Sequence, residues 1–135
     1  MPHRIAFLKD NGVVVLRLSG DILLPEVESA LSEIPSQPWF HAHLKMIVDT
    51  RACTTAMTGK DVQAIASCAR ALDPVWGETK WAVLAPKDLI FGLVRIYIAI
   101  TSDFEVQTRV FRTSSEATDW LGAGVDIDEA LGPAS

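Results

Sequence analysis

The chain alternates between short apolar runs and residues typical of turns or helix caps. Residues 4–9 and 13–19 are apolar-rich runs joined by an Asp-Asn-Gly segment at residues 10–12. Asn and Gly tolerate positive φ, so this segment predicts an antiparallel hairpin. Apolar positions recur with helical spacing over residues 25–34, which predicts an amphipathic helix bounded by prolines. Residues 44–50 show little polar alternation, as expected of a strand covered on both faces.

The pattern continues with two further helices and a strand between them. Thr58 and Asp61 have the spacing of a capping box, and the helical spacing after them continues to Pro74. Residues 80–85 predict another buried strand, and residues 89–100 predict a third helix that is apolar around most of its circumference.

The last elements are a strand, a helix and a tail. Residues 105–112 alternate between apolar and polar positions, which is typical of an edge or half-covered strand. Thr113 and Glu116 form a second capping box, and the helix that they begin ends at Gly122. For the acidic tail, residues 123–135, we expect either frayed chain or one short helical turn.

This order of elements predicts one α/β domain over residues 1–122, followed by the tail at 123–135. Helices alternate with strands after the hairpin, and right-handed crossovers then give parallel strands. We therefore expect a mixed sheet of about five strands, formed by an N-terminal hairpin and then parallel strands, with about four helices packed on it.

The composition is that of a folded domain, and it disfavours several classes of function. The 135 residues are 49% hydrophobic and 21% charged, which is ordinary for a folded domain. The net charge of -5 disfavours binding to nucleic acid or to an anionic membrane. The apolar runs are too short for a signal-peptide core or a membrane span, so we expect a cytoplasmic protein. Cys53 and Cys68 lack CxxC spacing and fit reduced thiols.

The chain contains no recognisable catalytic motif. It lacks a G-x-S-x-G elbow, a Walker loop and a G-x-G-x-x-G loop, and its histidines lack the spacing of a metal site. We therefore expect a binding module without enzymatic activity, cofactor or metal.

The third predicted helix has two apolar faces. One arc contains Leu89, Leu93, Ile96 and Ile100, and the other contains Phe91, Val94, Arg95 and Ile98. The sheet of the same chain can cover only one face, so we expect a second copy to cover the other in a homodimer. Gly92 and Ala99 would let the partner's backbone approach closely. The candidate dimer interface is Phe91, Gly92, Val94, Ile98 and Ala99.

Arg95 is the one charged residue within this apolar segment. An unpaired buried guanidinium is unfavourable, so Arg95 must reach water, a carboxylate such as Asp49 or Asp88, or an anion. It could also make a contact across the dimer. One hypothesis places Arg51, Phe91 and Arg95 in a small ligand pocket at the carboxyl ends of the parallel strands. Such a pocket would take a small apolar or anionic ligand.

Four segments resemble one family of small bacterial proteins. These segments are VVVLRLSGDILLPEVESAL, MIVDTR, WAVLAPKDLIFGLVRIY and RVFRTSSEATDWL, in the family's order and over nearly the whole chain. The chain resembles the SpoIIAA-like proteins, which are related to STAS domains and grouped with Sec14-type lipid-binding folds. The resemblance implies this fold, an intracellular bacterial setting and a regulatory or binding role.

The resemblance also implies a second kind of function. Thr58 occupies roughly the position at which STAS anti-sigma-factor antagonists carry a phosphorylated serine. A phosphate there would be stabilised by the free N–H groups at a helix N-terminus, whereas plain N-capping by Thr58 is the alternative. The sequence thus predicts a homodimeric binding module for a partner protein or small ligand, or else an antagonist switched by phosphorylation of Thr58.

Overall fold

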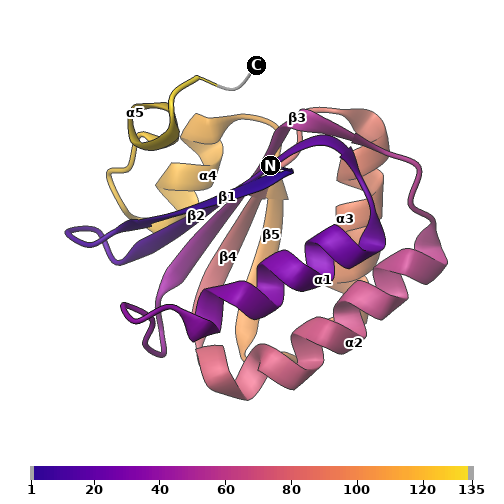
Figure 1. The fold of residues 1–135 in the computed structure, drawn as a ribbon, viewed down its shortest axis with the longest axis horizontal. Helices are drawn as coiled ribbons and strands as arrows, with labels where there is room; N and C mark the ends of the chain where they lie inside the picture. The colour runs from indigo at the N-terminus through magenta and orange to yellow at the C-terminus, as the bar shows by residue number, and fades with distance from the viewer. Residues whose placement is uncertain (1, 134–135) are drawn as a thin grey trace.

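The computed structural model describes residues 2–133 and contains one five-stranded sheet (Figure 1). The strands lie side by side in chain order, and β1 is antiparallel to β2 whereas β3, β4 and β5 continue parallel to it. Their bounds are β1 His3–Leu8, β2 Val13–Ile22, β3 Lys45–Thr55, β4 Thr79–Leu84 and β5 Val106–Phe111. The predicted fold class, a hairpin continued into parallel strands, is confirmed.

Five helices cover the sheet. They are α1 Leu24–Glu33, α2 Gly59–Trp76, α3 Asp88–Ile100, α4 Ser114–Leu121 and α5 Ile127–Leu131, and a 3-10 turn, Ile34–Ser36, comes directly after α1. The main difference from expectation is that α2 continues through Pro74 to Trp76. Pro74 lies in the last turn, and the Gly77 N–H donates to the Asp73 carbonyl at 2.9 Å to close the helix.

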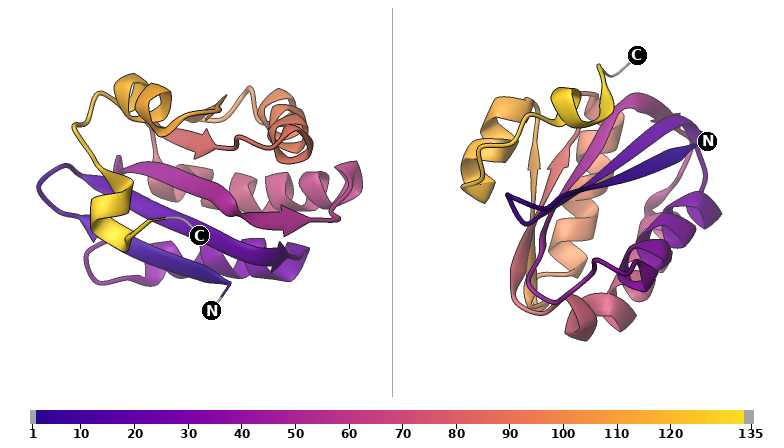
Figure 2. Two further views of the ribbon diagram at one scale, coloured as in Figure 1. Left: turned by 90° about the horizontal axis from the view of Figure 1, so that it is seen from above. Right: turned by 60° about the vertical axis from the view of Figure 1, so that its left-hand side comes forward.

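The helices form one layer on each face of the sheet. Because consecutive parallel strands are adjacent and joined by right-handed crossovers, α1, α2 and α3 all lie on one face. Helices α4 and α5 cover the opposite face, as the right-hand view of Figure 2 shows. Alternate residues of β2 accordingly enter different cores, Val14 and Leu16 with α1–α3 and Val13 and Val15 with α4 and α5.

The predicted tail packs on the sheet over the part that the structure describes. Helix α5 buries Ile127 and Leu131 in the same core as Val13 and Val15, and it contacts β1. The short turn expected in this segment is therefore present, whereas the division of the chain at residue 122 stays a prediction. Between residues 2 and 133, no helix combines the length and apolar character needed to cross a membrane.

Candidate functional site

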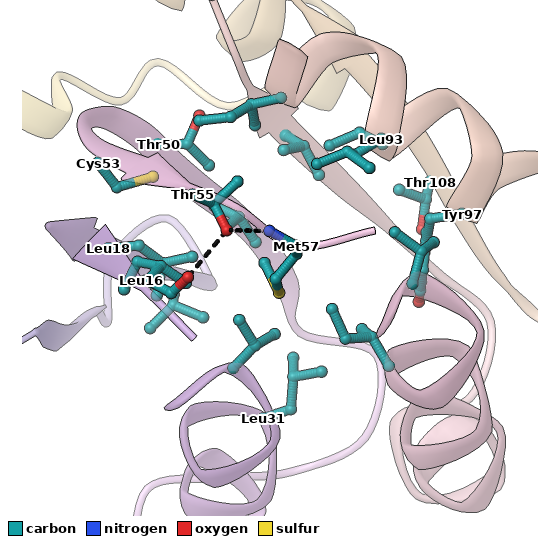
Figure 3. A pocket seen from close by; sticks show the side chains of 18 of the residues that line it. Leu16, Leu18, Leu31, Thr50, Cys53, Thr55, Met57, Leu93, Tyr97 and Thr108 are labelled. Carbon is teal, nitrogen blue, oxygen red and sulfur yellow. Dashed lines mark hydrogen bonds between the residues drawn. The ribbon is translucent and has the colours of Figure 1, made fainter. Parts of the chain in front are cut away.

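A cavity of about 130 Å³ lies between the sheet and helices α1, α2 and α3 (Figure 3). Its floor is formed by strand residues such as Leu16, Met46 and Val83, which strand alternation directs to this face. Leu31 of α1 and Leu93 of α3 contribute to the walls. An engineered apolar cavity of about 150 Å³ stays dry and binds benzene, so this space suits a ligand of about that size.

Two threonine hydroxyls in the cavity wall are already hydrogen-bonded to the backbone. Thr50 Oγ1 donates to the Leu84 carbonyl at 2.7 Å. Thr55 Oγ1 donates to the Ile22 carbonyl at 2.8 Å and accepts from the Met57 N–H at 3.1 Å (Figure 3). These hydroxyl protons are therefore used in holding the strand ends and are not offered to a ligand.

Two residues of the wall, Trp81 and Tyr97, have polar atoms that are buried away from the cavity. Trp81 Nε1 has no hydrogen-bond partner among residues 2–133, and Tyr97 Oη lies beside the Thr108 hydroxyl. Burial raises the pKa of Tyr97 well above its ordinary value, and the neighbouring Thr108 hydroxyl offsets only part of that rise (Figure 3). Neither polar atom reaches the surface of the cavity, which is entirely apolar, so a ligand in the cavity would not hydrogen-bond to them.

The remaining chemistry of the wall is apolar. Burial raises the pKa of the Cys53 thiol to about 11, although the positive charge of Lys87 opposes this rise, so the thiol is protonated at neutral pH. Among the described residues that line the cavity there is no aspartate, glutamate, histidine, lysine or arginine. The wall can therefore hold an apolar ligand by contact alone.

A cluster of ion pairs lies on the opposite face of the sheet, beneath α5. Arg17 Nε donates to Asp49 Oδ2 at 2.9 Å, and Arg51 Nε donates to Asp49 Oδ1 at 3.0 Å. Burial by itself raises the pKa of Asp49, but the hydrogen bonds from Arg51 and Arg17 outweigh it and leave the pKa below its ordinary value. Arg51 also donates to Asp128 of α5 and lowers the pKa of that carboxyl.

The structure does not bring Arg51, Phe91 and Arg95 together into the predicted pocket. Arg51 belongs to the ion-pair cluster under α5, whereas Phe91 packs against the core on the other face and the Arg112 guanidinium lies 4.2 Å from its ring centre. Arg95 is exposed on α3. The carboxylates suggested as its partners are paired elsewhere, Asp49 as described and Asp88 with Arg112 at 2.6 Å. Water therefore solvates the Arg95 guanidinium.

The exposed face of α3 differs from the predicted one. Leu89 and Ile96, which were placed together on one apolar arc, are 59% and 43% exposed. Of the candidate dimer residues, Gly92 and Ala99 are exposed beside them, whereas Val94 lines the cavity and Phe91 and Ile98 are half-buried. Both predicted arcs are divided, because Leu93 of the first arc lines the cavity whereas Arg95 of the second arc is exposed.

Thr58 is the exposed residue that precedes the first turn of α2. Asp61 Oδ2 accepts hydrogen bonds from the Thr58 N–H at 2.9 Å and from its hydroxyl at 3.4 Å. This is the carboxylate half of the predicted capping box, and it places a negative charge beside the hydroxyl.

Sequence reasoning considered Asp49 only as a partner for Arg95 and overlooked Arg17. Arg17 interrupts an otherwise apolar strand, and Asp49 ends the apolar part of the neighbouring strand. Opposite charges inside two strands that are covered on both faces indicate a buried pair, and the register Arg17↔Asp49 brings the two together. The sequence contains no comparable signal for the cavity, because the cavity depends on how α1, α2 and α3 pack on the sheet.

We predict that Asp49→Asn lowers the free energy of unfolding by about 3 kcal/mol, because it leaves Arg17 and Arg51 short of a buried counter-charge. The folded-state pKa values of Asp49 and Asp128 lie below the unfolded value of about 3.9, so their stabilisation is complete above that pH and is lost as pH falls further. Urea unfolding between neutral pH and pH 3 measures both effects. Asp119→Asn, which removes an exposed carboxylate from α4, is the control, and equal losses in the two variants would contradict the prediction.

Two solved structures are similar to this chain in fold. An uncharacterised protein of the DUF3478 family with a SpoIIAA-like fold, from Shewanella loihica PV-4, has a TM-score of 0.58 at 12% identity, covering 88% of this chain and 91% of that one. An anti-sigma factor antagonist from Mycobacterium paratuberculosis has a TM-score of 0.53 at 16% identity, covering 89% of this chain and 92% of that one. No family model and no curated protein matches the chain in sequence. The chain has a SpoIIAA-like fold of the kind found in STAS domains.

Proposed function

We propose that the protein is a non-catalytic binding module whose cavity takes a small apolar ligand. The observation that carries the proposal is the cavity of about 130 Å³ between the sheet and α1–α3, whose surface is entirely apolar. Contact with this wall would remove the apolar surface of a ligand from water.

The cavity favours a neutral ligand over an anionic one. The basic residues considered for an anion, Arg51 and Arg95, lie outside its wall, and no other basic residue of the described chain lines it. An unpaired anion in such surroundings would be strongly disfavoured. A compact neutral hydrocarbon fits the wall better.

Cyclohexanone should bind with a Kd of about 0.1–1 mM, the affinity expected when about six carbon atoms are buried. Methylcyclohexane has the same number of heavy atoms but no polar atom to desolvate, so it should bind more tightly by a few-fold. Amide chemical shifts in a two-dimensional NMR titration measure both affinities and identify the residues that respond.

Val94→Phe places a ring into the cavity and should weaken cyclohexanone binding at least about tenfold. The matched control is Ile96→Phe, which adds the same ring to the outer face of the same helix and should bind as the wild type does. Equal affinity in Val94→Phe and Ile96→Phe, or shifts that do not map to the cavity, would contradict the proposal.

We also propose that two copies associate through the outer face of α3. Two large apolar side chains, Leu89 and Ile96, flank the small residues Gly92 and Ala99 on this face, which supports a close helix-to-helix contact.

In sedimentation velocity at micromolar concentration, the wild type should be a dimer and Ile96→Glu a monomer. Val75→Glu, at an exposed apolar residue of α2, should remain a dimer. A monomeric wild type would contradict the proposal.

A phosphorylation switch at Thr58 is the second candidate function. The exposed hydroxyl at the start of α2 and the fold similarity to an anti-sigma factor antagonist favour it. The Asp61 carboxylate, 3.4 Å from the hydroxyl, opposes it by like-charge repulsion of a phosphate. If the switch operates, protein from its native host should carry a phosphate, detected by mass spectrometry, that Thr58→Val abolishes. Unmodified wild-type protein would contradict it.

A further inference from the structure

Three arginines from three adjacent strands converge beneath α5. Strand pairing places them together, because Arg4 of β1 lies opposite Arg17 of β2, and Arg17 lies beside the strand that carries Arg51. Arg17 is only 6% exposed, Arg51 is half-buried and Arg4 is exposed at the rim. The sheet therefore gathers guanidinium groups from a buried centre to an accessible edge.

The sheet supplies too few negative charges for these arginines. Asp49 is the carboxylate that the sheet contributes, and it is fully buried between Arg17 and Arg51. The second carboxylate is Asp128, which comes from α5. Without α5, the three arginines and Asp49 would carry two uncompensated positive charges in a chain whose net charge is otherwise negative.

Asp128 contacts the cluster as a bound ligand would. Its Oδ1 accepts from Arg51 Nη2 at 2.6 Å and from Arg17 Nη2 at 3.2 Å, and its Oδ2 accepts from Arg51 Nη1 at 3.3 Å. This two-pronged contact is how guanidinium groups recognise carboxylates and phosphates. The Asp128 side chain is 43% exposed, so the solvent reaches the edge of the contact.

The same segment supplies the other acceptors. Arg17 Nη1 donates to the carbonyls of Leu131 and Gly132 at 3.2 and 2.7 Å, and Arg4 Nη1 donates to the Leu131 carbonyl at 3.1 Å. Beyond these bonds, α5 is held by the buried side chains of Ile127 and Leu131. A helix of five residues is too short to be stable by itself, so its place depends on these contacts.

We propose that Arg4, Arg17 and Arg51 form a binding site for a phosphate group, and that Asp128 is a ligand carried by the chain itself, which an external phosphate displaces. A phosphate group carries a charge of about -1.5 to -2, which is closer to the two uncompensated positive charges than the single charge of Asp128 is. Its three or more acceptor oxygens can replace the acceptors that the α5 segment supplies. The site lies on the opposite face of the sheet from the cavity, so its test is independent of the proposed function.

Removing the Asp128 carboxylate should expose the site. A tethered ligand competes at an effective concentration in the millimolar range, so the wild type should bind inorganic phosphate only weakly. Asp128→Asn should bind it at least about tenfold more tightly. The Nε–Hε NMR signals of Arg17 and Arg51 report directly on the site in a titration with inorganic phosphate. A parallel titration with glycerol 3-phosphate shows whether the site prefers a free phosphate or a phosphoryl group on an organic molecule.

Matched variants separate this site from a general charge effect. Asp119→Asn changes the net charge by the same amount at an exposed position of α4, and it should bind phosphate as the wild type does. Arg51→Lys added to Asp128→Asn keeps the positive charge but removes the guanidinium fork, and it should lose most of the gained affinity. Tight binding by Asp128→Asn that Arg51→Lys abolishes supports the site.

Asp126→Ala provides a second route if Asp128→Asn does not fold. The Asp126 side chain accepts from the Asp128 and Glu129 N–H groups and caps α5, but it does not contact the arginines. Its loss weakens α5 while the site stays complete, so phosphate binding should tighten a few-fold. The proposal is overturned if folded Asp128→Asn binds phosphate no better than Asp119→Asn, or if Asp126→Ala binds no better than the wild type.

Discussion

The handedness of the strand crossovers determines how each face of this sheet is covered. Parallel strands that succeed one another in chain order and are joined by right-handed crossovers must place every connecting helix on the same face. Helices α1, α2 and α3 therefore form one layer, which has the cavity beneath it. Within residues 2–133, the other face is covered by the chain after β5, in which α4 packs on β4 and β5 and the short α5 packs on β1.

The ion-pair cluster is a consequence of this uneven cover. A five-residue helix buries few apolar side chains, so much of its attachment comes from hydrogen bonds between its acceptors and Arg4, Arg17 and Arg51. Arg17 and Asp49 are both buried in neighbouring strands, and each is tolerable there because the other neutralises it. One face is thus held by apolar packing and the other partly by charge, which explains why only the first suits an apolar ligand.

The sequence predicted the elements better than it predicted the sites. Turn and cap residues located the hairpin and four helices, because those signals act over a few neighbouring residues. Arg95 drew attention as a lone charge among apolar residues, yet a helix that contacts the core on one side leaves it a solvent face. The buried charge is instead Arg17, because a strand that is covered on both faces has no face exposed to solvent. Periodicity also did not locate the core side of α3, because the buried side falls between the two apolar arcs, at Ile90 and Tyr97.

The proposed function depends on the space beneath α3 being a cavity that persists in the folded protein. A crystal structure of the protein under xenon pressure tests this most directly, because xenon enters apolar cavities of this size without needing a specific contact. We expect xenon density between Met46, Val83 and Leu93, with the helices unmoved. Side chains that have closed the space, with no xenon bound there, would contradict the account.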